Sequence, residues 1–581
     1  MQMTKKTLHL ILILCFFLHG FAFSKNDKKN ILDSDAEFNN GSHIMLEHLT
    51  ENQIENLVLL SKVWGFVKYH HPIITTGQLH WDYALFRVMP KILAAPDRDA
   101  ANAILHMWIV NIGAVTKCQS CASLKIADIQ LQPRLQWING PSSSLNASLK
   151  SDLVEIYLNR SAAAEQFYVA QTPGIGNPKF IHELDYNNIL FPDSGFQLLA
   201  LFRFWNIVEY WAPYRDQIGE DWDGVLRESI VKVGLAKERA TYQLELMAVI
   251  ARINDTHANL WGSLSLRPPV GFCSLPIITR FIEGRALVTD YANNEIGKES
   301  GLQVGDIIEA IDGNSVDNLV RTWRPYYAAS NEATRLRDIA RGLSVGNCGL
   351  TKVKFQRKSG SKEILVNRVS TTILRSRTTH DRAGATFQLL FDDIAYIKLS
   401  SIRQADIDGY LKMAAGTKGM IIDIRNYPSD FVPFALGKHF VDKPTEFVRF
   451  TVGDLSNPGS FHWGPLLKID PHPQQYEGKV MILLDETSQS QAEYTAMALR
   501  TGVRAKVIGS TTAGADGNVS LIPLPGGLTS KISGIGVFYP DKRPTQRIGI
   551  VPDIEVIPTI HGIRAGLDEV LETAIVEIRK N

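Results

Sequence analysis

Three short apolar runs in the last third of the chain predict strands that are buried on both faces. The runs are Ala395–Leu399, Gly419–Ile424 and Val480–Leu484. Near-continuous apolar runs of this length are typical of parallel strands with helices on both sides of the sheet. A helical segment, 490–500, follows the third run. Residues 393–581 therefore alternate strands with helices, as an α/β unit does.

The first half of the chain contains a pattern that repeats at a fixed offset. The segments Trp64–Pro72 and Trp205–Pro213 carry tryptophan, tyrosine and proline at the same places, and Trp81-Asp82 matches Trp222-Asp223. Each matched pair is separated by 141 residues. The apolar spacing predicts helices, and the proline past each first helix ends it. We therefore predict a duplicated helical unit. Its copies span residues 45–121 and 186–268.

One histidine distinguishes the second copy from the first. At the same offset, His257 in the segment Asp255–Ala258 falls opposite Thr116. A lone histidine at a helix end is more often a capping or core residue than a catalytic one. His257 becomes a candidate for chemistry only if a partner exists elsewhere in the chain.

The region between and after the helical copies has strand-like spacing. Residues 122–185 contain strands and loops without a clear pattern. From about residue 269 the periodicity changes, and Ile277–Phe281 and Arg285–Asp290 are predicted strands.

The N-terminus has the pattern of a signal peptide. Two lysines precede the apolar run Leu8–Leu18, and small residues follow as far as Ser24. The run is too short to span a bilayer comfortably. We expect cleavage that removes residues 1–24, export of the protein, and no membrane span in the mature chain; a retained N-terminal anchor is the alternative.

Four cysteines remain after that cleavage: Cys118, Cys121, Cys273 and Cys348. An even number in an exported protein permits disulfides. The Cys118–Cys121 pair is interpreted as a structural bridge or as two free thiols. With no second pair or Cys/His cluster nearby, we expect no metal site.

Composition and charge exclude several classes of protein. Of the 581 residues, 45% are hydrophobic and 21% charged, which indicates a globular chain of several domains. Basic and acidic residues nearly cancel, at 61 and 60, so no basic excess exists for nucleic-acid binding. Phosphate-binding, dinucleotide-binding and zinc-protease motifs are all missing from the sequence, and we expect no cofactor.

Ser490 lies where chemistry at a serine is favoured. It follows the third buried strand and begins the next helix. Free N–H groups and the positive end of a helix dipole favour a developing oxyanion there. The alternative is a capping box in which Ser490 pairs with Glu493, three residues later.

Three motifs around this serine carry a family resemblance. They are Ser488–Glu493, Val507–Gly514 and Gly549–Asp553. With them the chain resembles the C-terminal-processing (tail-specific) serine peptidases, and the resemblance implies that Ser490 is the nucleophile. It also implies a catalytic domain over residues 373–581 with a ClpP/crotonase-like α/β core.

A second resemblance concerns residues 269–372. The segment Ser300–Gly313 has a Gly-Leu, a Gly-Asp, a short apolar strand and an Asp-Gly turn. It is similar to the bacterial PDZ domain, in which a peptide adds a strand at a sheet edge and its carboxylate meets backbone N–H groups. Val270, Gly271 and Phe272 would form the carboxylate loop. The alternative is a packing domain without a ligand.

The resemblance also implies a general base. Where the tail-specific branch has its base lysine, this chain has Ala515. The tricorn-core branch uses a histidine in a Thr-Ser-His-Ala type motif, and Asp255–Ala258 is similar to it. The resemblance therefore names His257 as the base. Gln546 takes the place of that branch's orienting glutamate, and an amide stabilises imidazolium less than a carboxylate does.

The implied oxyanion hole departs from the family pattern. The family strand ends in Asp-x-Arg-Gly-Asn, whereas this chain has Asn426 in place of the glycine. The N–H of Asn426 or Tyr427, paired with that of Gln491, would form the hole.

Together these patterns predict a multidomain α+β protein that acts as a serine peptidase on polypeptides. It would be exported to the bacterial periplasm, the cell envelope or the medium. Ser490 would attack, His257 would act as base and Gln546 would orient it. The alternative is a catalytically inactive, PDZ-bearing scaffold that binds peptides. The altered glycine and the missing carboxylate favour that alternative.

Overall fold

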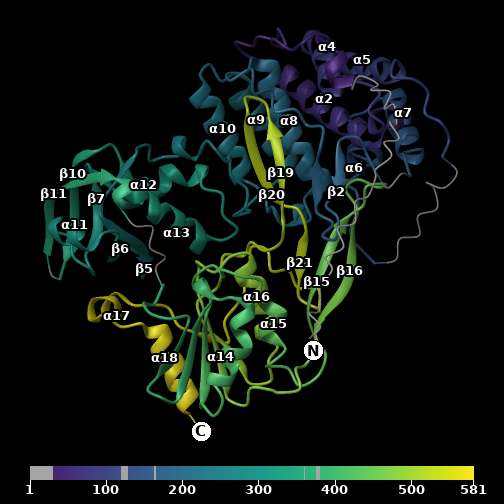
Figure 1. The fold of residues 1–581 in the computed structure, drawn as a ribbon. Coiled ribbons are helices and arrows are strands. Elements are labelled where there is room, and N and C mark those ends of the chain that lie inside the picture. Colours follow the sequence, from purple (N-terminus) through teal and green to yellow (C-terminus); the bar gives the residue numbers. More distant parts are fainter. Residues whose placement is uncertain (1–30, 119–127, 163–164, 359, 375–379, 581) are drawn as a thin grey trace, which may run out of the picture.

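The computed structural model describes residues 31–118, 128–162, 165–358, 360–374 and 380–580. The expected signal peptide, 1–24, lies outside these ranges. So does Cys121, whereas Cys118 is disulfide-bonded. Figure 1 shows a helical part, a β-rich part and a C-terminal part that lies below both. This mixture of helix and sheet in several units is the coarse architecture that the sequence predicts.

Long helices in the helical part form two sets with the same internal contact. Trp64 Nε1 donates to the carbonyl of Trp81 at 3.2 Å, and Trp81 Nε1 donates back to that of Trp64 at 3.0 Å. Trp205 and Trp222 make the same exchange at 2.7 and 3.3 Å. As predicted, a proline lies two residues past the end of each first helix. The sets are α2 (Glu51–His70), α4 (Trp81–Ala94) and α5 (Arg98–Val110), then α8 (Ser194–Trp211), α9 (Trp222–Gly234) and α10 (Arg239–Ala251).

Shorter elements complete this part. They are α1 (Ile31–Ser34), α3 (Pro72–Thr75), α6 (Gln136–Asn139), α7 (Ala147–Leu158), β1 (Ile129–Leu131), β2 (Val169–Gln171) and β3 (Pro178–Phe180).

The β-rich part is a sheet with an apolar core of its own. Its strand order is β5 (Ile277–Ile282), β6 (Arg285–Tyr291), β7 (Ile307–Ile311), β10 (Gly349–Arg357), β11 (Gly360–Ser370), β4 (Cys273–Ser274) and β9 (Val345–Gly346), with β8 (Asn314–Ser315) beside β7. The strands predicted from Ile277 and Arg285 are confirmed. Helices α11 (Asn294–Glu299), α12 (Val316–Trp323) and α13 (Glu332–Leu343) complete this part, and α13 packs against β5. A disulfide joins Cys273 to Cys348.

The C-terminal part is built on a six-stranded sheet. Its order is β12 (Phe387–Leu390), β13 (Ile394–Lys398), β14 (Gly419–Asp423), β17 (Lys479–Leu484), β18 (Ala505–Gly509) and β22 (Ile554–Glu555). The strands from β13 to β22 are parallel.

Both faces of this sheet are covered, as the apolar runs predict. Alternate residues of β13, β14 and β17 enter two separate apolar cores. Helices α14 (Ile407–Met413), α15 (Pro433–Gly437) and α16 (Gln491–Leu499) contribute to one core, and α18 (Glu569–Arg579) contributes to the other. Figure 1 shows α16 and α18 on opposite sides of the strands, with α17 (Ile560–Ala565) beside α18.

A hairpin from the C-terminal part enters the helical part. Its strands are β19 (Val519–Leu524) and β20 (Leu528–Ser533), and Figure 1 shows them rising beside α8 and α9. Ile522, Leu524, Leu528 and Ile532 are buried in the same apolar core as the long helices. The hairpin therefore carries residues of the last third of the chain to the end of α10.

A second connection runs through a four-stranded sheet. Its order is β1, β16 (Phe461–Ile469), β15 (Thr445–Gly453) and β21 (Gly536–Phe538), so one strand comes from the first half of the chain and three from the last third. Among the residues described, no helix is both long enough and apolar enough to cross a bilayer.

Candidate active site

Ser490 is the N-cap residue of α16 and has a strained backbone. It lies just past β17, at the carboxyl end of a parallel strand, with φ 58° and ψ −121°. Glycine adopts this conformation readily, whereas a residue with a Cβ pays roughly 1–3 kcal/mol for it. Such a turn between a strand and a helix presents a nucleophilic side chain at the edge of a sheet. The positive end of α16 also favours negative charge at this point.

A buried glutamate fixes the backbone around Ser490. Glu493 Oε2 accepts the N–H groups of Ser490 and Ala515 at 3.1 and 3.0 Å, and Oε1 accepts that of Gly514 at 2.8 Å and the Thr512 hydroxyl. The Ser490 N–H also contacts the carbonyl of Ala515, at 3.0 Å. Burial raises the pKa of Glu493, and the four donors oppose that rise. The glutamate of the expected capping box therefore also ties the serine to the loop after β18.

His257 lies just past α10, and its ring is held on the Nδ1 side. Nδ1 lies 3.0 Å from Ser533 Oγ and 3.6 Å from Asp255 Oδ1. Ser533 Oγ donates to Asp255 Oδ1 at 3.1 Å, so this hydroxyl accepts from Nδ1–H. That pattern leaves Nε2 unprotonated, as a general base requires.

The surroundings of His257 favour the neutral imidazole. Burial lowers its pKa below 6.5 and the charge of Lys531 lowers it further, while Asp255 opposes both. The carboxylate of Asp255 also accepts the backbone N–H groups of His257 and Ser533, at 3.0 and 2.6 Å. Asp255 and Ser533 thus hold both the ring and the backbone of the histidine.

A short segment before α13 joins the histidine loop to the serine loop. The Ser330 hydroxyl accepts the N–H of Thr256, next to His257, at 3.0 Å, and Ser330 N–H donates to the Thr256 hydroxyl at 2.9 Å. The adjacent Asn331 donates to the carbonyl of Thr512 at 2.8 Å. Thr512 in turn binds Glu493. One continuous set of hydrogen bonds therefore includes the loops of both candidate residues.

Sequence comparison finds relatives of the segment that contains Ser490. Residues 393–556 match the family described as Peptidase family S41. A probable CtpA-like serine protease of Staphylococcus haemolyticus is 23% identical over 274 residues, which are 46% of this chain and 50% of that protein. A Chlamydia trachomatis protein is 32% identical over 110 residues, 18% of each chain. The chain thus spans half or less of the length of these curated relatives.

Solved structures share the fold of a large part of this chain. Mature CPAF superposes with a TM-score of 0.53 at 17% identity, over 66% of this chain and 98% of that chain. CPAF complexed with lactacystin has a TM-score of 0.52 at 17% identity and covers 66% and 99% of the two chains. At this level of identity the likeness is one of fold.

Gln546 reaches the histidine loop, but through another residue. Its Nε2 lies 3.4 Å from Ser330 Oγ, and its buried Oε1 has no partner among the described residues. It lines a small cavity with Asp255 and Ser533. The polar partners of the His257 ring are therefore Asp255 and Ser533. Sequence reasoning missed both roles, although Asp255 lies only two residues before the histidine.

The three residues expected at the oxyanion hole lie on the loop after β14 and at the start of α16, and a hydrogen bond joins these two segments. Asn426 is buried and Tyr427 is 56% exposed, and both follow β14. Gln491 Nε2 donates to the carbonyl of Asp430 at 2.7 Å. The Ser488 hydroxyl donates to a carbonyl just past β14 at 2.9 Å. Asn426 and Tyr427 therefore border the loop that leads to Ser490.

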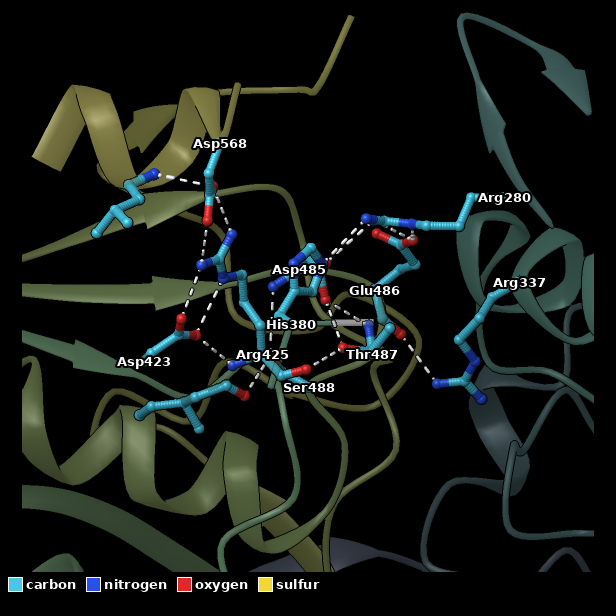
Figure 2. Close-up of polar contacts among 12 residues, drawn as sticks. Arg280, Arg337, His380, Asp423, Arg425, Asp485, Glu486, Thr487, Ser488 and Asp568 are labelled. Atoms are coloured by element: carbon cyan, nitrogen blue, oxygen red, sulfur yellow. Dashed lines mark hydrogen bonds and ion pairs between the residues drawn. The ribbon is translucent and has the colours of Figure 1, made fainter. Parts of the chain in front are cut away.

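An ionic cluster links this loop to the β-rich part. Figure 2 shows that Arg280 of β5 forms ion pairs with Asp485 and Glu486, at 3.0 and 2.7 Å. His380 contacts Asp485 as well, at 2.8 Å. Burial opposes ionisation of Asp485, but His380 and Arg280 hold its pKa well below 3.8. Arg337 of α13 donates to the carbonyl of Glu486 at 2.9 Å. Residues of the β-rich part therefore hold the segment before Ser490 in place.

A cavity of about 570 Å³ lies between the histidine loop, α13 and the segment before Ser490. Thr256 and Gln489, the neighbours of His257 and Ser490, both line it, as does Gly271. Val270 and Phe272, also expected to bind peptide ends, are 56% and 79% exposed. Among the described residues, no group of three or more His, Cys, Asp or Glu side chains is placed to hold a metal ion.

Proposed function

We propose that the protein is an exported serine peptidase that hydrolyses peptide bonds through an acyl-enzyme at Ser490. The strained serine at the start of α16, inside an S41 segment, carries this proposal. Similarity to a probable serine protease supports the same reaction. Polypeptides are the substrates that such a reaction requires.

His257 acts as the general base in this proposal. Its Nε2 takes the proton of the Ser490 hydroxyl while Oγ bonds to the scissile carbonyl carbon. The same proton passes to the leaving amine as the C–N bond breaks, and water then releases the acyl group by the reverse roles. Asp255, acting directly and through Ser533, stabilises the imidazolium that forms between these transfers.

The developing oxyanion would lie at the start of α16. The N–H of Gln491, paired with that of Asn426 or Tyr427, would stabilise it. Gln546 would support the histidine loop through Ser330.

The domain organisation follows the same proposal. Residues 269–372 would be a PDZ-like module that binds peptide ends near Val270–Phe272, and residues 373–581 the catalytic unit with a ClpP/crotonase-like core. The helical copy over 186–268 would supply His257. The signal-peptide pattern of residues 1–24 supports a location in the periplasm, the cell envelope or the medium.

A fluorophosphonate probe tests the proposal, because it labels a serine only where a base activates it. The wild-type protein is expected to label, and Ser490→Ala and His257→Ala are expected to lose labelling. Ser361→Ala and His561→Ala are matched controls, since both side chains are exposed and far along the chain from the candidate site.

Two outcomes would overturn the peptidase assignment. One is the absence of labelling in a folded wild-type protein, and the other is equal labelling in all four variants. Either outcome would favour the inactive, peptide-binding scaffold, which Asn426 and Gln546 had favoured.

A further inference from the structure

The cavity beside the candidate residues has an excess of positive charge. Arg267, Arg337 and Arg341 line it, and Asp338 is its acidic lining residue. This leaves a net charge of +2 on the wall of a concave space of about 570 Å³. Charge of one sign in a cleft concentrates the field and attracts ligands of the opposite sign.

One of the arginines is fully engaged by the protein. Arg337 contacts both oxygens of Asp338, at 2.9 and 3.1 Å. It also donates to the carbonyl of Glu486 at 2.9 Å and to Gln489 Oε1 at 3.2 Å. All three guanidinium nitrogens of Arg337 therefore donate to protein groups. The residue shapes the cavity but has no pair of donors free for a ligand.

The other two arginines keep donors for a ligand. Arg267 stacks on Tyr327, with its guanidinium 4.1 Å from the ring centre, and makes a weak contact of 3.4 Å with Asn259. Within the described chain, no carboxylate lies at ion-pair distance from Arg267. Arg341 uses Nη1 on Asp338 at 3.1 Å, and its side chain is 64% exposed.

A further cation lies at the edge of the same cavity. Lys531 Nζ is 4.4 Å from the ring centre of Trp261, which lines the cavity and is 37% exposed. The structure pairs Lys531 with no described carboxylate. Arg267, Arg341 and Lys531 thus lie around a space lined by Thr256 and Gln489, and a bound anion would give Arg267 and Lys531 the charge partner that they lack among the described residues.

We propose that this cavity binds a carboxylate of the substrate peptide through Arg267 and Arg341, so that the enzyme prefers acidic substrates. The guanidinium fork matches a carboxylate in two parallel hydrogen bonds. The carboxylate belongs to an Asp or Glu side chain of the peptide. The inference rests on the proposed peptidase function, because it describes the substrate of that site.

The test uses fluorogenic peptides in which one glutamate moves along an otherwise neutral sequence. Each has a partner with glutamine, and each is made as a free acid and as a C-terminal amide. kcat/KM is measured with the wild-type protein, and Kd with Ser490→Ala, which separates binding from hydrolysis. A gain of roughly tenfold for a carboxylate is expected at low salt, falling as salt screens the pair.

Variants decide which residues carry the preference. Arg267→Gln combined with Arg341→Gln is expected to abolish it, whereas the exposed Arg321→Gln, which removes one positive charge in α12, retains it. Equal rates and affinities for acidic and neutral peptides would overturn the inference, as would a preference that survives the double change. A preference that follows glutamate supports the inference, whereas one that follows the amide-to-acid change alone overturns it, because the chain end is then the ligand.

Fluorophosphonate labelling of the same preparations separates the two proposals. Labelling without an acidic preference overturns this inference alone. Absence of labelling in the wild-type protein overturns the peptidase function, while acidic preference in the Kd values of Ser490→Ala still reports on the cavity.

Discussion

The hydroxyl of Ser533 lies 3.0 Å from Nδ1 of His257, although 276 residues separate them in the chain. Ser533 also bonds to Asp255, so this hydroxyl lies between the carboxylate and the imidazole in a chain of hydrogen bonds. In the proposed mechanism, the role that an orienting carboxylate plays in serine hydrolases is divided between Asp255 and a hydroxyl. The pH dependence of hydrolysis should report this arrangement.

Two substitutions should shift the midpoint of the pH profile of kcat/KM in opposite directions. A base must be neutral, so kcat/KM rises with pH through the pKa of His257, which burial places below 6.5. Asp255→Asn removes the charge that raises this pKa; the midpoint should fall, and the plateau should fall by about 10²–10⁴-fold. Lys531→Gln removes a charge that lowers the pKa, so its midpoint should rise. The exposed Lys362→Gln serves as control. Midpoints that move in the same direction would contradict the assignment.

Ser490→Gly should stabilise the protein while it abolishes labelling. Glycine removes the strain of a positive φ, and its greater freedom in the unfolded chain offsets part of the gain, which leaves roughly 1 kcal/mol. Thermal unfolding should show a transition about 1–3 °C higher than that of the wild type. Ser490→Ala keeps the Cβ and should not show the rise. A glycine variant no more stable than the alanine variant would show that the backbone is not strained.

Strands β13, β14 and β17 can be predicted from their apolar runs because both faces of a central parallel strand are buried. The position of Ser490 at a helix start can also be predicted, because the apolar strand before it and the helix after it are both recognisable in the sequence. These features depend on contacts with near neighbours in the chain.

The side chains that contact His257 could not be predicted from such local patterns. Ser533 reaches the ring because the hairpin of β19 and β20 buries its apolar side chains among α8, α9 and α10. Local periodicity carries no information about which helices receive a hairpin. Alignment with a family motif led instead to Gln546, whose side chain contacts Ser330.

Asp516 should make stability decrease as pH rises. Its side chain is 3% exposed, and one oxygen has no partner among the described residues. Burial, reinforced by the charge of Glu493, raises the pKa of Asp516 well above 3.8. The folded state therefore binds this proton more tightly than the unfolded state, and its stabilising effect is present below pH 3.8 and lost at higher pH.

Asp516→Asn should remove that dependence. The difference in Tm between variant and wild type should shift in favour of asparagine from pH 5 to pH 8, because asparagine does not ionise. The exposed Asp470→Asn is the control and should show no such slope. A constant difference in Tm across this range would show that Asp516 is ionised in the fold.

The inserted hairpin has a consequence for the biosynthesis of the protein. His257 leaves the ribosome 233 residues before Ser490, and the hydroxyl that orients it emerges later still. A chain that ends before residue 519 would contain His257 and Ser490 but would lack the hairpin that bears Ser533. In the proposed mechanism, hydrolytic competence would therefore depend on docking of the hairpin among the helices late in synthesis.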